Sequence, residues 1–210
     1  MFYINEYDRS SWPITEPKGI SFMTQGANAS LSYADITAKL ADKSIMLIGL
    51  MGSGKTVIGR MLAQAVACDF VDSDKQIEDE SNLRITDIFD LYGEPKFREM
   101  ERRVIGKLIT QKKTIISVGG GAFCQAEIRE MAKGHVTVVW LRAAPSELLS
   151  RIDNLSSRPL LSGDNPLGVL ERLHHERFDD YLCADIIVDT DGLSLRQSLE
   201  KLLGAIAEQA

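Results

Sequence analysis

The stretch "SIMLIGLMGSGKTVIGRMLAQAVA", residues 44–67, contains three features in series that decide the fold. A short apolar run at residues 44–49 ends in a glycine and is typical of a buried strand. A glycine-rich turn then leads into residues 55–67, whose apolar positions have helical spacing. The stretch therefore predicts a strand, a tight turn and a helix in immediate succession.

The turn itself, "GLMGSGKT" at residues 49–56, matches the pattern GxxxxGK[ST] in full. Its glycines let the backbone wrap closely around phosphate oxygens, and amides of the loop and helix N-terminus point at the anion. In this pattern Lys55 reaches the β- and γ-phosphates and the Thr56 hydroxyl ligates Mg²⁺. A glycine-rich turn that carries Lys-Thr by chance is the alternative. The flanking strand and helix favour a site for a nucleoside triphosphate, but GTPases, motors and small-molecule kinases share this loop.

Further strands and helices alternate along the chain. This pattern predicts right-handed crossovers and a parallel sheet that helices cover on both faces. The expected strands are residues 44–49, 69–72, 114–121, 136–141 and 185–190, and the expected helices are residues 55–67, 75–82, 85–109 with a Gly/Pro break, 146–152 and 195–209.

Composition limits the class of protein. The chain has 210 residues, of which 44% are apolar, and this length predicts one domain with a globular core. The net charge of −6 argues against nucleic acid as a partner. Three cysteines, Cys68, Cys124 and Cys183, form no CxxC pattern, and no His/Cys cluster has zinc spacing.

The N-terminal region differs from the rest. Residues 1–30 mix prolines, glycines and polar residues without a clear period, and we expect a poorly ordered extension before a single domain at residues 31–210. No apolar run approaches the roughly 20 residues of a membrane span, and the N-terminus resembles neither a signal nor a transit peptide. We therefore expect a cytoplasmic protein without membrane contact. We also expect a monomer.

Two aspartates follow the second expected strand in "DFVDSD", residues 69–74. Ligands of parallel sheets gather beyond the carboxyl ends of the strands, so Asp72 is expected near the phosphates. Asp74 is two residues away and is able to point the same way. Alternatively, Ser73 to Gln76 fits a capping box, which would make Asp74 a first-turn acid that suits the helix dipole.

Other candidates occur near strand ends and in loops. The stretch "SVGGG", residues 117–121, ends in three glycines that lack Cβ atoms. Such a backbone is able to lie close to a ligand, or it forms a flexible turn. Arg98 and Glu101 have the spacing of a helical ion pair. Segment 153–167 is rich in Ser, Pro and Gly and carries one arginine, Arg158. A mobile lid that brings a cation to transferring phosphates has this composition, but an ordinary surface loop is equally compatible.

Taken together, the motifs identify a family. "GLMGSGKTVIGRMLA", "FVDSD", "ITDIFDLYGEPKFREMERRV", "SVGGGA", "SSRPLL" and "ERFDDYLCADIIVDT" occur in this order and closely resemble shikimate kinase over roughly residues 44–208. The resemblance implies an α/β fold, namely a three-layer α/β/α P-loop kinase fold with a five-stranded parallel sheet. It also implies a substrate-binding helical segment at residues 73–103 and a mobile lid at residues 153–167. The expected reaction is the ATP- and Mg²⁺-dependent phosphorylation of the 3-hydroxyl of shikimate, on the route to chorismate and aromatic amino acids.

The resemblance also implies roles for single residues. An arginine fork suits the carboxylate of shikimate, and phosphoryl transfer needs mainly positioning and charge stabilisation. Asp74 would either accept the hydroxyl proton or only orient the hydroxyl. The implied catalytic residues are Lys55, Asp74 and Arg158; nucleotide contacts are Gly52, Ser53, Gly54, Lys55, Thr56, Val57, Arg151 and Arg158; substrate contacts are Asp74, Arg98, Gly119, Gly120, Gly121, Arg177, Phe89 and Phe97; metal contacts are Thr56 and Asp72.

Two other functions fit the phosphate loop less well. A gluconate kinase would share the scaffold, but two arginines with the DxD and GGG motifs favour a hydroxylated cyclic acid. A GTPase switch should show an N/T-KxD guanine signature, which is not found. Two features depart from the family: an N-terminal extension of about forty residues, and "DTDGLSL" after the last strand, where many relatives carry a polar or basic residue near adenine.

Overall fold

The computed structural model describes residues 43–155, 159–161 and 163–209. Its centre is a five-stranded sheet in the order β2-β3-β1-β4-β5, in which every pair of neighbours is parallel. The strands are β1 (Ser44–Ile48), β2 (Asp69–Asp72), β3 (Thr114–Ser117), β4 (Val136–Arg142) and β5 (Ile186–Asp189). The predicted parallel α/β architecture is confirmed, although β3 ends before the three glycines. The predicted extension at residues 1–30 lies outside the described residues.

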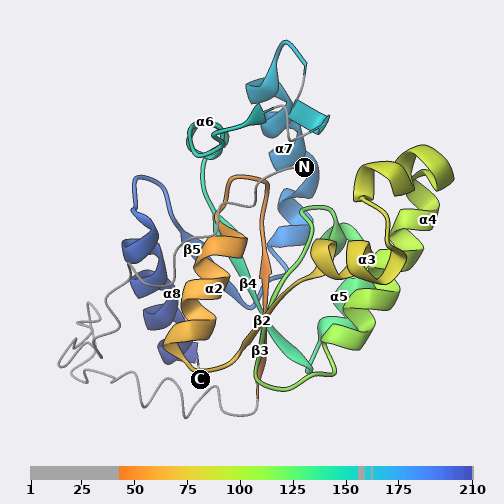
Figure 1. Cartoon of the computed structure of the whole chain (residues 1–210). Helices are drawn as coiled ribbons and strands as arrows, with labels where there is room; N and C mark the ends of the chain where they lie inside the picture. Colours follow the sequence, from red (N-terminus) through yellow and green to blue (C-terminus); the bar gives the residue numbers. More distant parts are fainter. Residues whose placement is uncertain (1–42, 156–158, 162, 210) are drawn as a thin grey trace, which may run out of the picture.

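Helices cover both faces of the sheet (Figure 1), with α2 and α8 on one side and α3, α4 and α5 on the other. The predicted helix break is present, because Gly93 has non-helical φ and ψ of 76° and 170° inside α4. Helix α5 and the full extent of α7 were not predicted. The helical segments are α2 (Lys55–Ala65), α3 (Ser73–Ser81), α4 (Ile85–Leu108), η1 (Ala122–Cys124), α5 (Ala126–Ala132), α6 (Pro145–Ser150), η3 (Pro159–Leu161), α7 (Pro166–Tyr181) and α8 (Leu195–Gln209).

The central strand β1 explains why the core has two halves. All five of its residues are buried, and alternate side chains point to opposite faces. Ile45 and Leu47 pack with α2 and α8, whereas Met46 and Ile48 pack with α3, α4 and α7. The loop that follows β1 is therefore anchored on both sides. Of the helices described here, none is long and apolar enough to cross a membrane.

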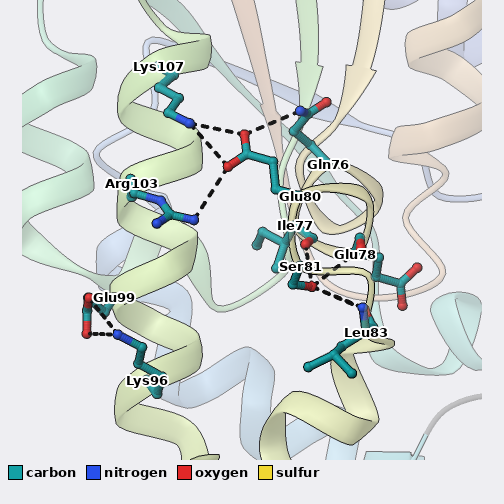
Figure 2. A network of polar contacts seen from close by, with 10 residues as sticks. All are labelled: Gln76, Ile77, Glu78, Glu80, Ser81, Leu83, Lys96, Glu99, Arg103 and Lys107. Carbon is teal, nitrogen blue, oxygen red and sulfur yellow. Dashed lines mark hydrogen bonds and ion pairs between the residues drawn. The ribbon is translucent and has the colours of Figure 1, made fainter.

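Ion pairs connect α3 and α4, the helices that carry several of the predicted substrate-binding residues (Figure 2). Glu80 on α3 accepts from Lys107 at 3.1 Å and pairs with Arg103 at 3.4 Å, both on α4. These contacts between two helices lower the pKa of the Glu80 carboxyl, chiefly through the hydrogen bond from Lys107. Ile77 of α3 and Ile105 of α4 also belong to one buried core cluster, so these exposed ion pairs add to an arrangement that packing already fixes.

Strand register places the ends of three strands at one level. Leu47 of β1 and Asp72 of β2 both align with Ser117 of β3. The turn after β1, the start of α3 and the three glycines therefore leave the sheet at the same edge. This edge carries the candidate site.

Candidate active site

A cleft of about 1080 Å³ opens at this carboxyl edge of the sheet. Its lining combines residues of the phosphate loop, of α3 and α4, and of α7. Residues 119–121, here called the glycine segment, and residues near the start of α8 complete it. The structure thereby brings together most of the residues singled out from the sequence. Predicted residues that line it are Gly52, Ser53, Gly54, Lys55, Thr56, Val57, Asp72, Asp74, Phe97, Arg98, Gly119, Gly120, Gly121, Arg151 and Arg177.

The phosphate loop is shaped by its glycines. Gly52 has a φ of 84°, and a Cβ atom there would lie 2.4 Å from the backbone oxygen of Leu148. Only glycine fits this position. The Lys55 ammonium donates to the backbone oxygens of Gly49, at 2.8 Å, and Leu50, at 3.1 Å. Carbonyl groups of the loop thus hold the Lys55 ammonium group in place at the start of α2.

Thr56 and Asp72 meet beside the loop. The Thr56 hydroxyl donates to Asp72 Oδ2 at 3.0 Å, and Asp72 Oδ1 accepts from the Asp74 amide at 3.1 Å. A hydroxyl and one carboxylate fit Mg²⁺, which binds few protein groups and keeps waters and phosphate oxygens as its other ligands. Within the described ranges, no group of three or more His, Cys, Asp or Glu side chains is placed to hold a metal.

The capping-box interpretation of Ser73 to Gln76 is wrong. Asp72 is the N-cap of α3, with extended φ and ψ of −100° and 120°, and its side chain caps the Asp74 amide. Ser73 is the first helical residue instead, and its buried hydroxyl accepts from the Gly119 amide at 3.4 Å. The last residue of β2 therefore starts α3 directly, which fixes Asp74 in the first turn.

The Asp74 carboxyl occupies an unfavourable environment for a charge. Its Oδ1 atom is buried and has no hydrogen-bond partner among the described residues. Burial, the nearby Asp72 charge and the Glu101 charge raise the pKa of Asp74 from its ordinary 3.8 to about 6, although Lys55 acts in the opposite direction. A carboxyl group that titrates near neutrality suits proton transfer.

Three consecutive glycines approach three different candidate side chains. A Cβ atom on Gly119 would lie 2.8 Å from Asp74 Oδ1, and one on Gly120 would lie 3.0 Å from Arg177 Nη1. On Gly121 it would lie 2.8 Å from Arg98 Nη2. The absence of side chains at all three positions is therefore what gives the cleft its room beside a carboxylate and two guanidinium groups.

Arg98 is held by two glutamates of its own helix. Its Nη1 donates to Glu101 Oε2 at 2.6 Å, whereas Nε and Nη2 both donate to Glu94 Oε1 at 3.1 and 3.0 Å. Glu101 is only 1% exposed, so the predicted Arg98–Glu101 pair is not a solvated surface pair. Burial raises the pKa of the Glu101 carboxyl, and Arg98, Gln125 and Arg177 act against that rise.

Aromatic residues behave differently from one another. Phe97 is buried, lines the cleft and lies under the Arg98 guanidinium at 5.2 Å. Phe89 is 37% exposed, does not line the described cleft and contacts the Phe97 ring at a centroid distance of 4.7 Å. Tyr181, which the sequence did not single out, donates its hydroxyl to the Gly120 oxygen and so anchors the glycine segment to α7.

Arg151 and residues 193–195 after β5 also line the cleft. Arg151 donates to the Thr190 hydroxyl at 3.0 Å and to Thr190 O, and pairs with Glu147. The stretch "DTDGLSL" therefore contributes by holding Arg151. Arg158 lies outside the described residues, so its predicted lid position is not placed. Of the predicted lid, the structure describes residues 153–155, 159–161 and 163–167.

Comparisons with known proteins agree with one another. A family model described as shikimate kinase matches residues 51–207. A protein named shikimate kinase from Mesorhizobium japonicum is 42% identical over 76% of this chain and 78% of its own length. The solved shikimate kinase from Acinetobacter baumannii in complex with shikimate is 34% identical, with a TM-score of 0.77, and the match covers 82% of this chain and 97% of that one. A shikimate kinase structure from Bacteroides thetaiotaomicron is 29% identical, with a TM-score of 0.73 over 78% of this chain and 97% of that one.

Proposed function

The chain belongs to the shikimate kinase family, and we propose that it transfers the γ-phosphoryl group of ATP to the 3-hydroxyl of shikimate. One observation carries the acceptor assignment: the glycine segment is flanked by the Asp74 carboxylate and by the guanidinium groups of Arg98 and Arg177, beside the phosphate loop. A small acid with ring hydroxyls needs such a pairing of base and cations. The product would be shikimate 3-phosphate, on the route to chorismate and aromatic amino acids.

On the nucleotide side, backbone amides of Gly52, Ser53 and Gly54 would bind phosphate oxygens together with Lys55. Thr56 and Asp72 would hold Mg²⁺, which when bound supplies positive charge to the transferring phosphates. Val57 would flank the nucleotide. Arg151, fixed by Thr190, would flank adenine, and Arg158 would add a cation when the lid closes.

On the acceptor side, the forks of Arg98 and Arg177 would bind the shikimate carboxylate, because a guanidinium matches a carboxylate bidentately. The backbone of Gly119, Gly120 and Gly121 would approach the ring. Phe97 would wall the pocket, with Phe89 supporting the Phe97 ring.

The chemistry follows from this placement. The 3-hydroxyl oxygen forms a bond to the γ-phosphorus while the bond from that phosphorus to the bridging oxygen of ADP breaks. Asp74 orients the hydroxyl and takes its proton late, since the transition state of phosphoryl transfer is loose. All the proposed residues come from one chain, which is consistent with a monomeric enzyme.

A coupled assay of ADP release tests the proposal. We expect release to depend on shikimate, with little activity when quinate, gluconate or a nucleoside monophosphate replaces it. Folded protein that shows no shikimate-dependent turnover would refute the proposal, and preference for gluconate would favour the rival kinase.

Arg98→Ala tests the carboxylate site directly. Removing a charge-assisted bidentate contact should raise KM for shikimate by about a hundredfold and leave KM for ATP within about twofold. Arg172→Ala is a matched control, since Arg172 pairs with Glu176 on the exposed side of α7. Equal increases in both KM values for Arg98→Ala would mean that Arg98 has only a structural role.

A further inference from the structure

Gln125 lies outside the residues assigned above, yet its backbone is fixed close to the glycine segment. It follows Gly121 by four residues and joins η1 to α5. Its amide donates to Ala122 O at 3.1 Å, and its carbonyl accepts from the Ile128 and Arg129 amides at 3.1 and 3.2 Å. As the N-cap of α5 it occupies a position that the surrounding backbone determines. Its side chain therefore starts from a fixed point.

That side chain crosses to α4 and joins two charged groups. Gln125 Nε2 donates to Glu101 Oε2 at 2.7 Å, and Gln125 Oε1 accepts from Arg102 Nη1 at 2.7 Å. An ionised carboxylate only accepts hydrogen bonds and a guanidinium only donates them. Both neighbours therefore favour the same orientation of the Gln125 side-chain amide, with Nε2 towards Glu101 and Oε1 towards Arg102. Arg102 thus determines which way the amide points, and the amide nitrogen is aimed at Glu101.

Glu101 transmits this contact to the substrate pocket. Its Oε2 atom, which accepts from Gln125, also accepts from Arg98 Nη1 at 2.6 Å. The other oxygen, Oε1, is buried without a hydrogen-bond partner in the described part of the chain. Oε1 also lies 3.0 Å from the point where a Gly119 Cβ would sit, close to Asp74. One oxygen of Glu101 therefore carries both contacts that determine how the carboxylate is oriented.

Loss of the Gln125 contact would affect that orientation. Glu101 is almost completely buried, and the nearby Asp74 carboxylate opposes its charge. Donors to Oε2 favour the ionised form and fix the plane of the carboxylate. With Arg98 as its single remaining donor at this oxygen, Glu101 would be free to rotate or to take up a proton, and Arg98 would lose a fixed partner.

We propose that Gln125, oriented by Arg102, is a positioning residue that holds Glu101 and through it aims the Arg98 guanidinium at the carboxylate of the acceptor. This inference rests on the proposed function, because it takes Arg98 as the carboxylate-binding group. Gln125 touches neither substrate nor reacting atoms, so its removal should alter acceptor binding far more than the chemical step.

Gln125→Glu tests the inference with almost no change in shape. The new carboxylate is still able to accept from Arg102 but, when ionised, has no proton to donate to Glu101. At about pH 8 we expect KM for shikimate to rise about tenfold, with kcat and KM for ATP within about twofold of wild type. The defect should shrink as the pH is lowered, because a proton on either of the two facing carboxylates restores a hydrogen bond between them.

The charged groups around Glu101 set the limits of this pH effect. Arg98, on the same helix, and Arg177, from α7, favour its ionised form, whereas the Asp74 carboxylate from α3 repels it. Gln125→Met keeps the length of the side chain without a donor. It should raise KM for shikimate about tenfold without the recovery at lower pH.

Arg102→Ala and Arg103→Ala form a matched pair on α4. Arg102→Ala frees the amide to rotate and should raise KM for shikimate about threefold. Arg103 pairs with Glu80 instead (Figure 2), so Arg103→Ala should leave both KM values unchanged. Melting temperatures report whether each variant is folded.

The outcomes separate this inference from the proposed function. Wild-type protein without shikimate-dependent turnover would overturn the proposed function. An active wild type whose folded Gln125 variants keep the wild-type KM for shikimate would overturn only the role of Gln125. A purely structural role would lower the melting temperature and change both KM values together, and if the Gln125 variants do not fold, an unchanged KM for shikimate in Arg102→Ala overturns the inference.

Discussion

The two halves of the cleft are built in different ways. The phosphate loop consists of eight consecutive residues, 49–56, and surrounds its lysine with its own carbonyl groups. The acceptor pocket instead gathers side chains from α3, α4 and α7 around the glycine segment. The first half needs only local backbone geometry, whereas the second depends on how distant elements pack against one another.

The halves also differ in electrostatics. In the acceptor pocket, Asp74 and Glu101 each bury a carboxylate oxygen without a partner among the described residues, and the pKa of each carboxyl is raised. In the phosphate loop the corresponding buried atom is the neutral Ser53 hydroxyl. Buried charge is costly unless it is paired, so the acceptor pocket is where we expect function to oppose stability.

Asp74→Asn should separate function from stability most strongly. Because Asp74 is proposed to orient the hydroxyl and take its proton, its loss should lower kcat about a thousandfold. The same change should stabilise the ligand-free protein. Folding raises the pKa of Asp74 to about 6, so the ionised carboxylate destabilises the folded state. The stability of the wild type therefore falls as the pH rises from about 4 to 6.

Denaturant unfolding and initial rates measure the two effects. At about pH 7.5 the Asn variant should be more stable by about 3 kcal/mol, and the difference should diminish towards pH 4. Asp79→Asn is a suitable control, since Asp79 is an exposed residue of the same helix that pairs with Lys75. Near-wild-type kcat would rule out both proposed roles of Asp74, and unchanged stability would mean that its burial carries no cost.

A pair of glycine substitutions tests whether the halves act separately. Gly52→Ala places a Cβ 2.4 Å from Leu148 O, and Gly119→Ala places one 2.8 Å from Asp74 Oδ1. We expect Gly52→Ala to weaken ATP binding about a hundredfold, and Gly119→Ala to raise KM for shikimate by a similar factor. Calorimetric titration with each ligand measures both.

Gly204→Ala provides the control for this pair, because a Cβ at this position in α8 meets nothing within 4 Å. Each site variant should affect mainly its own ligand. If either glycine variant weakened the binding of both ligands equally, the two halves of the cleft would form one mechanical unit and would not act separately.

The same contrast explains what the sequence predicts well. The strand, turn and helix around residues 49–56 were predicted correctly because motif and structure are both local. The Arg98–Glu101 pair was predicted from helical spacing and is confirmed at 2.6 Å. Its burial was not predicted, because it depends on the packing of α4 against the sheet edge. Helix α5 has only seven residues, too few to show a clear helical period.

Contacts between distant elements are where prediction from the sequence fails. Gln125 and Glu101 are 24 residues apart, and Tyr181 and Gly120 are 61 apart, so no spacing rule connects them. The misassigned cap at Ser73 has a different cause. Both Asp72 and Ser73 are good N-cap residues, and the choice depends on where β2 ends, which pairing with β3 decides.

Glu94 offers the smallest and most selective test of the acceptor half. Its carboxylate accepts hydrogen bonds from Nε and Nη2 of Arg98. The same edge of the guanidinium is able to bind the carboxylate of shikimate. Glu94 is 61% exposed, and such ion pairs contribute little free energy. Glu94→Gln should therefore lower KM for shikimate by about twofold, since a neutral amide competes less with the substrate for Arg98.

The control for this change is Glu99→Gln, which removes an exposed carboxylate that pairs with Lys96 on the same helix. It should leave KM for shikimate unchanged, so a twofold fall in both variants would reflect the net charge of the helix. A rise in KM for Glu94→Gln would show that Glu94 holds Arg98 in place for the substrate. In that case Arg98 would need both glutamates, and the acceptor pocket would depend on the local helix as much as the phosphate loop depends on its own backbone.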